Sequence, residues 1–222
     1  MDDDVVAKYD ALASTYSRRY ADPGAVARFY VDLVQRWGPE PPANARVLEV
    51  SCADGFMTEA LARGGYRVTA FDISPKMVAT ARARIQAAGV EADIEVGDIR
   101  MFESDSRWDV ILAPMWTFFA YVADPDPVLA RLAGALAPGG KLLVDRNPRS
   151  HPVREGIDAL ARAGLTGVEW RPVAVPLTKR LGALGAMGLR VALAMPPVRD
   201  RLLRRRLNVV LIGRRPEIPG KE

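Results

Sequence analysis

The sequence has little of several features on which other classes of protein depend. Its 222 residues contain one cysteine, Cys52, which cannot form an internal disulfide and favours the reducing cytoplasm over a secreted setting. The most apolar segment, residues 181–198, is interrupted by Arg190, three glycines and a Pro-Pro pair, so it is a poor transmembrane helix. The acidic first residues lack the basic-then-apolar pattern of a secretory signal. We therefore predict a cytoplasmic protein.

Positive charge is in small excess and is unevenly distributed. The net charge is +4, and seven arginines lie between residues 199 and 215. Such a cluster is typical of a solvated helix face, and less often of a surface that binds anionic membranes or nucleic acid. No RNA-binding signature or platform of aromatic residues accompanies it, so we predict no nucleic-acid partner. Weak contact of this C-terminal basic segment with a membrane surface stays open as an alternative.

The composition is that of an ordinary globular protein. Apolar residues make up 49% of the chain and charged residues 26%. A chain of this length can bury a substantial core, and we predict a single domain that spans residues 1–222.

The most informative stretch is residues 46–58. An apolar strand, 46–50, is followed by a turn of small residues and then by an amphipathic helix that begins near Phe56. A second strand, 67–71, ends at Asp72, about 20 residues beyond the turn. This is half of a nucleotide-binding βαβ unit, with an acid where such folds bind ribose hydroxyls.

The turn itself indicates which kind of nucleotide is bound. Dinucleotide sites use the pattern G-x-G-x-x-G, because the pyrophosphate approaches the backbone closely. Here Ser51 and Ala53 occupy the first two glycine positions, and each adds a Cβ atom. A nicotinamide or flavin site is therefore disfavoured, and we predict a nucleoside ligand without phosphates.

The remaining pattern alternates helices and strands. Helices are expected before the first strand and after the second strand, where Ser74-Pro75 combines a capping hydroxyl with proline at the first helical position. A helix from Asp124 is expected to continue through Leu136 and close at Pro138-Gly139-Gly140. Further strands are predicted at 92–96, 108–113, 141–145, 168–175 and 207–213, with a helix at 153–163.

The stretch from Val47 to Thr58 resembles motif I of class I S-adenosylmethionine-dependent methyltransferases. Glu49 matches the acid of that motif and Gly55 its last glycine, and the Cys-Ala-Asp-Gly form is similar to relatives of the nodulation N-methyltransferases. The resemblance covers roughly residues 9–147 and implies a Rossmann-like α/β fold. Its seven-stranded, mostly parallel sheet would have helices on both faces. The parts expected are an N-terminal helical cap (1–38), a cofactor-binding core (45–147) and a helical insertion or lid (177–206) before an antiparallel last strand.

The resemblance also implies roles for individual residues in binding S-adenosylmethionine. The cap would fold over the cofactor and bring Tyr16 near its methionine end, although aromatic residues at this spacing are more often core. An ionised carboxylate only accepts hydrogen bonds, so Asp98 suits the adenine amino group. The expected cofactor-binding residues are Tyr16, Glu49, Ser51, Ala53, Gly55, Asp72, Ile73, Met77, Asp98, Ile99 and Ala113.

The methyl acceptor is expected next to the fourth strand. Ligands of open parallel sheets bind outside the carboxyl ends of the strands, and an aromatic segment follows this strand. Aromatic rings attract a sulfonium by cation–π interaction, but core packing is an alternative role for them. His151, the only histidine, could act as a base or be merely structural. The expected acceptor-binding residues are Met115, Trp116, Phe119 and Tyr121.

These observations lead to one functional hypothesis with two alternatives. The hypothesis is a methyltransferase that moves the methyl group of S-adenosylmethionine to a small acceptor by in-line transfer. The apolar, Met-bearing segment 177–206 favours an apolar or amphiphilic acceptor. One alternative is a binding module that holds S-adenosylmethionine or S-adenosylhomocysteine without transfer. The other is a peripheral membrane enzyme that methylates a lipid or quinone, with 177–206 lying on the membrane. We predict no metal site, and the oligomeric state is left open.

Overall fold

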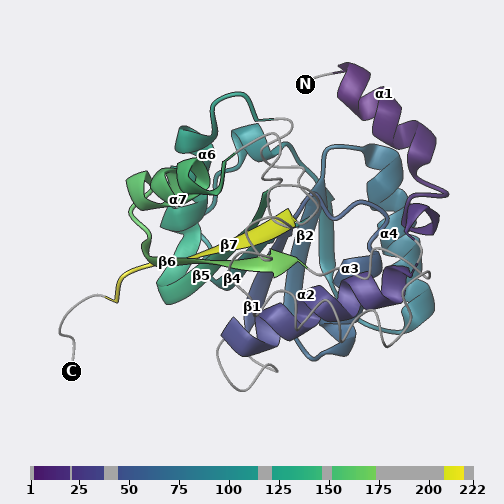
Figure 1. The fold of residues 1–222 in the computed structure, drawn as a ribbon. Coiled ribbons are helices and arrows are strands. Elements are labelled where there is room, and N and C mark those ends of the chain that lie inside the picture. Colours follow the sequence, from purple (N-terminus) through teal and green to yellow (C-terminus); the bar gives the residue numbers. More distant parts are fainter. Residues whose placement is uncertain are drawn as a thin grey trace, which may run out of the picture.

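The computed structural model of the protein describes residues 3–20, 22–37, 45–114, 122–146, 152–173 and 208–217. Within these ranges, seven strands form one sheet in the order β3-β2-β1-β4-β5-β7-β6 (Figure 1). The strands are β1 (Arg46–Val50), β2 (Arg67–Asp72), β3 (Asp93–Val96), β4 (Trp108–Ala113), β5 (Leu136–Arg146), β6 (Thr166–Val173) and β7 (Asn208–Arg214). The helices are α1 (Asp3–Leu12), η1 (Ser17–Arg19), α2 (Pro23–Trp37), α3 (Phe56–Arg63), α4 (Pro75–Ala88), η3 (Ile99–Met101), α6 (Pro125–Ala135) and α7 (Val153–Arg162).

The sheet is parallel from β3 to β5, and β7 runs antiparallel between β5 and β6. This confirms the predicted α/β fold with a mostly parallel sheet and an antiparallel last strand. The chain moves outward from β1 to β3 and then returns to β4 on the other side of β1. In open α/β sheets, ligands bind at this reversal, outside the carboxyl ends of the strands.

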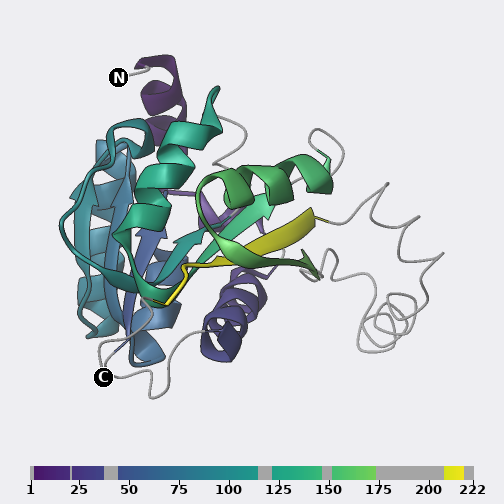
Figure 2. The same cartoon turned by 90° about the vertical axis from the view of Figure 1, so that its left-hand side faces the viewer.

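Helices cover both faces of the sheet, as predicted. In β1, Val47 packs into the core cluster that includes α2, α3 and α4, and Leu48 packs into the cluster that includes α6 and α7. Figure 2 shows α2 and α7 on opposite sides of the sheet. Because both faces are covered, the central parallel strands β1, β2 and β4 are buried along most of their length. The edge strand β3 is mostly exposed. No helix in the described ranges combines the length and apolar composition needed to cross a bilayer.

Most local predictions are confirmed. Strands β1 and β4 begin and end at the predicted residues, and α3 begins at Phe56. The Ser74 side chain accepts the backbone N–H of Met77 at 3.1 Å and caps α4. Helix α4 ends at Gly89, which adopts a left-handed conformation with φ 64°.

The predicted end of α6 is wrong. The helix stops at Ala135, and β5 begins at once at Leu136 and includes Pro138-Gly139-Gly140. The pairing of β4 with β5 shifts register between Trp108 and Val110, so the strand is irregular at this point. A Cβ atom at Gly140 would lie 2.9 Å from the Ala137 carbonyl oxygen, so the absence of a side chain allows the chain to continue here. The glycines therefore bend the strand instead of ending a helix.

The N-terminal helices occupy two positions. Helix α1 contacts α4 at the rim of the molecule, whereas α2 packs against α3 on the face of the sheet (Figure 1). The segment 177–206, predicted to be a helical insertion, lies outside the described residues.

Candidate functional site

The turn after β1 has an unusual backbone. Ser51 has φ 60°, Ala53 has φ 50° and Gly55 has φ 74°. The left-handed region costs about 1–2 kcal/mol for a residue with a Cβ atom, so Ser51 and Ala53 are strained. The turn therefore keeps the shape typical of a glycine-rich loop, although two of its left-handed positions carry side chains.

Asp72 joins this turn to the one that follows β2. Its Oδ2 accepts the backbone N–H of Ala53 at 2.9 Å, and its Oδ1 accepts the backbone N–H of Ser74 at 2.9 Å. The backbone N–H of Cys52 also donates to the Phe71 carbonyl at 3.0 Å. Burial raises the pKa of the Asp72 carboxyl, and the two backbone donors oppose that effect. Asp72, which is predicted to bind the ribose hydroxyls, is thus also the residue whose hydrogen bonds join the two turns.

Glu49 lies at the same edge, near the end of β1. Its side chain is buried, and the Thr58 hydroxyl donates a hydrogen bond to its Oε2 at 2.6 Å. Burial raises the pKa of Glu49 to about 8, and the nearby charges of Asp72 and Asp54 add to this increase, against the Thr58 hydrogen bond. Burial therefore favours the protonated form of Glu49 at neutral pH, and a positive group beside it would favour ionisation.

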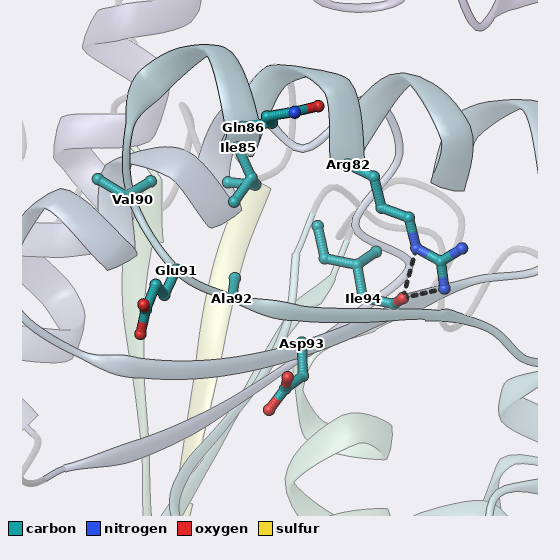
Figure 3. Close-up of a pocket in the computed structure, with 8 residues that line it drawn as sticks. All are labelled: Arg82, Ile85, Gln86, Val90, Glu91, Ala92, Asp93 and Ile94. Carbon is teal, nitrogen blue, oxygen red and sulfur yellow. Dashed lines mark hydrogen bonds between the residues drawn. The ribbon is translucent and has the colours of Figure 1, made fainter.

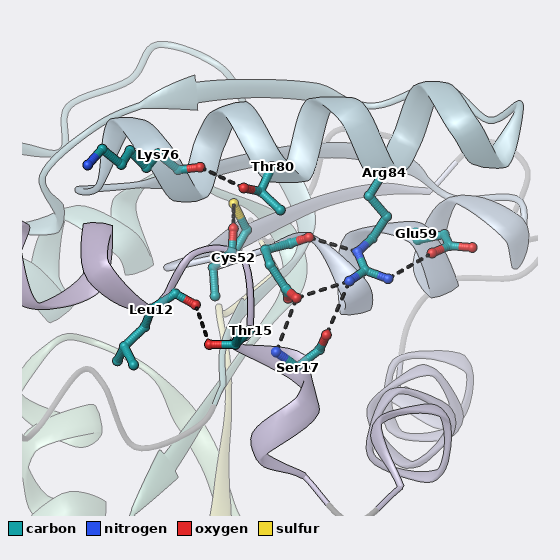
Figure 4. A network of polar contacts seen from close by, with 10 residues as sticks. Leu12, Thr15, Ser17, Cys52, Glu59, Lys76, Thr80 and Arg84 are labelled. Atoms are coloured by element: carbon teal, nitrogen blue, oxygen red, sulfur yellow. Dashed lines mark hydrogen bonds and ion pairs between the residues drawn. The ribbon is translucent and has the colours of Figure 1, made fainter.

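Asp54 lies in the turn among the predicted cofactor-binding residues, and the sequence analysis did not single it out. Its Oδ2 accepts the backbone N–H of Ser17 at 3.1 Å and the Nη2 of Arg84 at 3.0 Å. Figure 4 shows Arg84 between Ser17 and Glu59, and its Nη1 lies 3.6 Å from Glu59 Oε2. An acid inside a turn of small residues was the available signal, but Ser17 lies 37 residues away in sequence.

A second residue of the N-terminal segment contacts the other turn. The Ser74 hydroxyl donates to Asp10 Oδ1, and the backbone N–H of Lys76 donates to the same atom at 3.2 Å. The Ser74 hydrogen bond lowers the pKa of the Asp10 carboxyl. This places a carboxylate of α1 at the N-terminus of α4, where the helix dipole favours negative charge.

Tyr16 is buried in an aromatic cluster with Tyr9, Tyr20 and Phe56. The Tyr20 hydroxyl donates to the Tyr16 hydroxyl at 3.4 Å. Burial raises the pKa of Tyr16, and the charge of Asp72 contributes to this increase. The structure therefore brings Tyr16 close to the two turns, but inside a packed cluster.

At the end of β3, Asp98 is held by Arg100. The Nε of Arg100 lies 3.0 Å from both carboxylate oxygens, and its Nη2 lies 2.6 Å from Oδ2. These bonds lower the pKa of Asp98, which keeps the group an acceptor. Ile73 and Ile99 are half-buried, whereas Met77 has no exposed surface because it packs in the core.

Two hollows lie away from the turns. One, of about 540 Å³, follows the face of β1, β2 and β3 beside Phe102 and Trp108, and Asp98 is its one predicted site residue. The other, of about 390 Å³, lies between the end of α4 and β3 (Figure 3). There Arg82 donates to the Ile94 carbonyl through Nε at 2.9 Å and Nη2 at 2.6 Å, and no predicted site residue takes part.

The acceptor side of the site is described only in part. Ala113, at the carboxyl end of β4, is buried. The predicted acceptor-binding and catalytic residues lie outside the described residues: Met115, Trp116, Phe119, Tyr121 and His151. Within the described ranges, no group of three or more Cys, Asp or Glu side chains is arranged to hold a metal ion.

A buried hydrogen bond between α2 and β5 was also missed. The Tyr30 hydroxyl donates to Asp145 Oδ2, and both side chains are fully buried. The sequence places Asp145 at the end of an apolar strand, but its partner lies 115 residues earlier. This bond fixes the carboxyl end of β5 against the N-terminal helices.

The sequence of the segment that contains these turns matches a known family model. A family model described as a methyltransferase domain matches residues 47–140. Over 103 residues the chain is 34% identical to a ubiquinone biosynthesis O-methyltransferase of Xanthomonas axonopodis pv. citri (strain 306). This segment is 46% of the chain and 43% of that protein, so less than half of the curated relative is matched.

Solved structures share the fold over nearly the whole chain. The 4+2 cyclase SpnF has a TM-score of 0.70 at 18% identity, with 96% of each chain covered. The N-methyltransferase NodS of Bradyrhizobium japonicum WM9, in complex with S-adenosyl-L-homocysteine, has a TM-score of 0.59 at 20% identity. That match covers 89% of this chain and 94% of NodS. At these identities the similarity concerns the fold.

Proposed function

We propose that this chain is a class I S-adenosylmethionine-dependent methyltransferase and that it methylates a small-molecule acceptor. The observation that carries this proposal is the pair of turns after β1 and β2, joined by Asp72 at the edge of the sheet where the strand order reverses. The family model covers both turns.

The charges around the first turn fit S-adenosylmethionine and oppose a phosphate-bearing coenzyme. Glu49, Asp54 and Asp72 are all buried at or beside the turn, and Arg84 is engaged by Asp54. A pyrophosphate would add negative charge next to the carboxylates of Asp54 and Asp72 and is therefore disfavoured. The ammonium and sulfonium groups of S-adenosylmethionine would instead be attracted to these carboxylates and would favour ionisation of the protonated Glu49. Ser51 and Ala53 have positive φ, the backbone conformation for which glycine, the usual residue of the family at these positions, is suited.

In this proposal the two turns bind different parts of the cofactor. Glu49, Ser51, Ala53 and Gly55 hold the methionine portion, with Tyr16 nearby, and Asp72 accepts hydrogen bonds from the ribose hydroxyls. When bound, the cofactor supplies an activated methyl group that a nucleophile takes by in-line displacement. The protein then contributes mainly proximity and alignment, which can be worth about 7–11 kcal/mol.

Adenine recognition is assigned to the end of β3. Arg100 keeps the Asp98 carboxylate ionised, and a carboxylate oxygen can accept a further hydrogen bond from the adenine amino group. Ile73 and Ile99 are half-buried and available to pack against the ring, whereas Met77 has no exposed surface and would need a local change to reach it. Ala113 would line the cofactor side of β4.

The acceptor is assigned as apolar or amphiphilic. This assignment rests on the sequence of 115–121 and 177–206 and on the name of the curated relative, which acts in ubiquinone biosynthesis. The same resemblance supports a quinone- or lipid-methylating enzyme at a membrane surface as the second candidate. The proposal includes one domain (1–222), a cytoplasmic location, a cap at 1–38 and a lid at 177–206.

The cofactor assignment is tested by calorimetric titration with S-adenosylmethionine and S-adenosylhomocysteine, with NAD as the control ligand. We expect binding of the first two and none of NAD. Glu49 is protonated at pH 7 and would ionise beside the ligand ammonium, so binding should release about one proton there and progressively less as pH rises past the pKa of about 8. Titration in buffers of different ionisation enthalpy measures this release.

The variant Glu49→Gln keeps the size of the side chain and removes the proton release. We expect it to weaken S-adenosylhomocysteine binding by about 10- to 100-fold, because a charged hydrogen-bonding partner is lost. Wild-type protein that binds neither S-adenosylmethionine nor S-adenosylhomocysteine would refute the proposal. Binding without transfer of a tritiated methyl group to any component of a cell extract would favour the binding module instead.

A further inference from the structure

We propose that Asp54 is a positioning residue that couples the N-terminal segment, residues 3–20, to the turn that binds the cofactor. The inference rests on the proposed function for the identity of the ligand. It assigns a role to the acid of the Cys-Ala-Asp-Gly turn, which neither the predicted cofactor contacts nor the chemistry of transfer uses.

Asp54 gathers contacts from three parts of the fold. It lies in the turn between β1 and α3, accepts the Ser17 backbone N–H at 3.1 Å, and accepts Arg84 of α4 at 3.0 Å. Arg84 also donates through Nε to the Asp54 carbonyl at 2.8 Å and through Nη2 to the Ser17 hydroxyl at 3.2 Å. Figure 4 shows Ser17 and Arg84 meeting at this point.

The Asp54 side chain is shielded from water, so its few hydrogen bonds are its main compensation for lost hydration. The Asp54 residue is 2% exposed, and its Oδ1 is buried without a hydrogen-bond partner among the described residues. Its charge is therefore compensated through Oδ2 alone. If the segment left its place, the charge-assisted hydrogen bond from the Ser17 N–H to the carboxylate and the bond from Arg84 to the Ser17 hydroxyl would both be lost. Asp54 thus favours the state in which the segment is closed onto the turn.

The same segment also contacts the second turn. Asp10 accepts hydrogen bonds from the Ser74 hydroxyl and the Lys76 backbone N–H. Helix α1 contributes no fully buried side chain, but Tyr9 and Leu12 pack against the core from its partly buried face. Between the two polar contacts, Ala13 and Tyr16 pack into the core. One continuous segment is therefore attached to both turns that the cofactor would occupy.

The position of Asp54 next to Ala53 explains how ligand binding at the first turn can be coupled to closure of the N-terminal segment. The preceding residue, Ala53, is fixed by Asp72 and has a strained backbone. A ligand that holds this turn in its left-handed shape also holds the Asp54 carboxylate where Ser17 and Arg84 reach it. By linkage, the ligand stabilises the closed segment, and the closed segment strengthens binding by the same factor.

Limited digestion with trypsin measures this coupling. Arg18 and Arg19 are exposed cleavage sites in η1, next to Ser17, and cleavage there requires local opening of the segment. We expect Asp54→Asn to raise the cleavage rate at these sites about tenfold without ligand. Saturating S-adenosylhomocysteine should slow cleavage of the wild type several-fold and slow cleavage of Asp54→Asn much less.

Two further variants serve as controls. Asp126→Asn removes another arginine-paired aspartate, whose partner Arg162 lies 2.7 Å away between α6 and α7, and should leave cleavage at Arg18 unchanged. Arg84→Gln changes a side chain that is 31% exposed, so it should fold, and it should reproduce Asp54→Asn. If Asp54→Asn itself does not fold, Arg84→Gln provides the test.

The outcomes separate this inference from the proposed function. Equal cleavage of wild type and both variants without ligand would overturn the role of Asp54 in holding the segment. Faster cleavage, with the same protection by S-adenosylhomocysteine in all proteins, would overturn the coupling. If the wild type does not bind S-adenosylhomocysteine, the proposed function and the coupling fail, and the ligand-free rates still decide whether Asp54 holds the segment.

Discussion

The turns after β1 and β2 meet at the same edge of the sheet but are built in opposite ways. The second turn is specified mainly locally: Asp72 accepts the Ser74 N–H, and Ser74 and Pro75 start α4. It is also contacted by Asp10, from far away in sequence. The first turn has Ser51 and Ala53 in strained conformations, and the N-cap of α3, Gly55, offers no side-chain hydrogen bond. Besides the hydrogen bond from the Gly55 N–H to the Cys52 carbonyl at 3.0 Å, this turn is held by residues from elsewhere in the chain.

The two turns should therefore differ in how strongly their shape depends on residues far away in sequence. A locally encoded turn should survive changes in distant residues, because its own side chains satisfy its backbone. A turn held by Asp72 and by the Ser17 and Arg84 contacts of Asp54 should respond to changes far away in sequence. Such a turn can transmit the presence of a ligand to the N-terminal segment, and the following predictions test this contrast.

The largest effect is expected from Gly55→Ala. A Cβ atom would lie 2.8 Å from the Ala81 Cβ, and the backbone φ is 74°. Overpacking and left-handed strain together should lower the free energy of unfolding by about 2–5 kcal/mol. Gly89→Ala is the matched control, since its φ is 64° with nothing within 4 Å, and should cost about 1–2 kcal/mol. Equal losses in urea denaturation would show that the contact with α4 is unimportant.

Asp72→Ala should come next, because it removes the acceptor shared by both turns. The backbone N–H groups of Ala53 and Ser74 would lose their partners, and stability should fall by about 2–4 kcal/mol. Cofactor affinity should fall by about 1–3 kcal/mol, as expected for a lost hydrogen-bonding carboxylate. Asp72→Asn keeps one acceptor oxygen and should be intermediate in both. Unchanged affinity in a folded Asp72→Ala variant would mean that the ribose is held elsewhere.

Ser74→Ala breaks the locally encoded turn. It removes the cap on the Met77 N–H and the hydrogen bond to Asp10. We expect a loss of about 1 kcal/mol in thermal or urea unfolding, within the range for N-cap replacements. Ser104→Ala, at an exposed loop position, is a suitable control and should have little effect. A loss as large as that of Asp72→Ala would contradict the idea that this turn is supported mainly by its own residues.

The smallest effect, of opposite sign, is expected from glycine in the strained turn. Ser51→Gly and Ala53→Gly should each raise the free energy of unfolding by about 0.5–1 kcal/mol, because the relieved strain exceeds the added chain entropy. Cofactor affinity, measured by calorimetry, should be equal or higher. Marked destabilisation would show that the buried Ala53 side chain contributes more by packing than it costs in strain.

Much of the fold could be predicted because its signals are local. Strand β4 is an apolar run after Asp109, and α4 has a capping serine, a proline at its first position and a glycine after its end. The end of α6 was predicted wrongly, because Pro138-Gly139-Gly140 usually ends a helix. Here the same residues give β5 an irregularity against β4.

The candidate site was predictable only as far as its motif extends. The positions of Glu49, Asp72 and Asp98 near the carboxyl ends of β1, β2 and β3 could be predicted, because each acid lies at or near the end of an apolar run. Their roles in cofactor binding stay predictions. The contacts of Asp54 with Ser17, and of Tyr30 with Asp145, could not be assigned. Each joins residues far apart in sequence, and no local pattern specifies such a pair.

The sequence alone determined the order of strands and helices, the small-residue turn and the acids at the strand ends, since these depend on neighbouring residues and on periodicity. Tertiary structure decided what those acids contact. It placed Asp72 between two turns, raised the pKa of Glu49 by burial, and brought Ser17 to Asp54. Hydrogen bonding and desolvation act over a few ångströms in space, so their partners are set by the packing of distant segments.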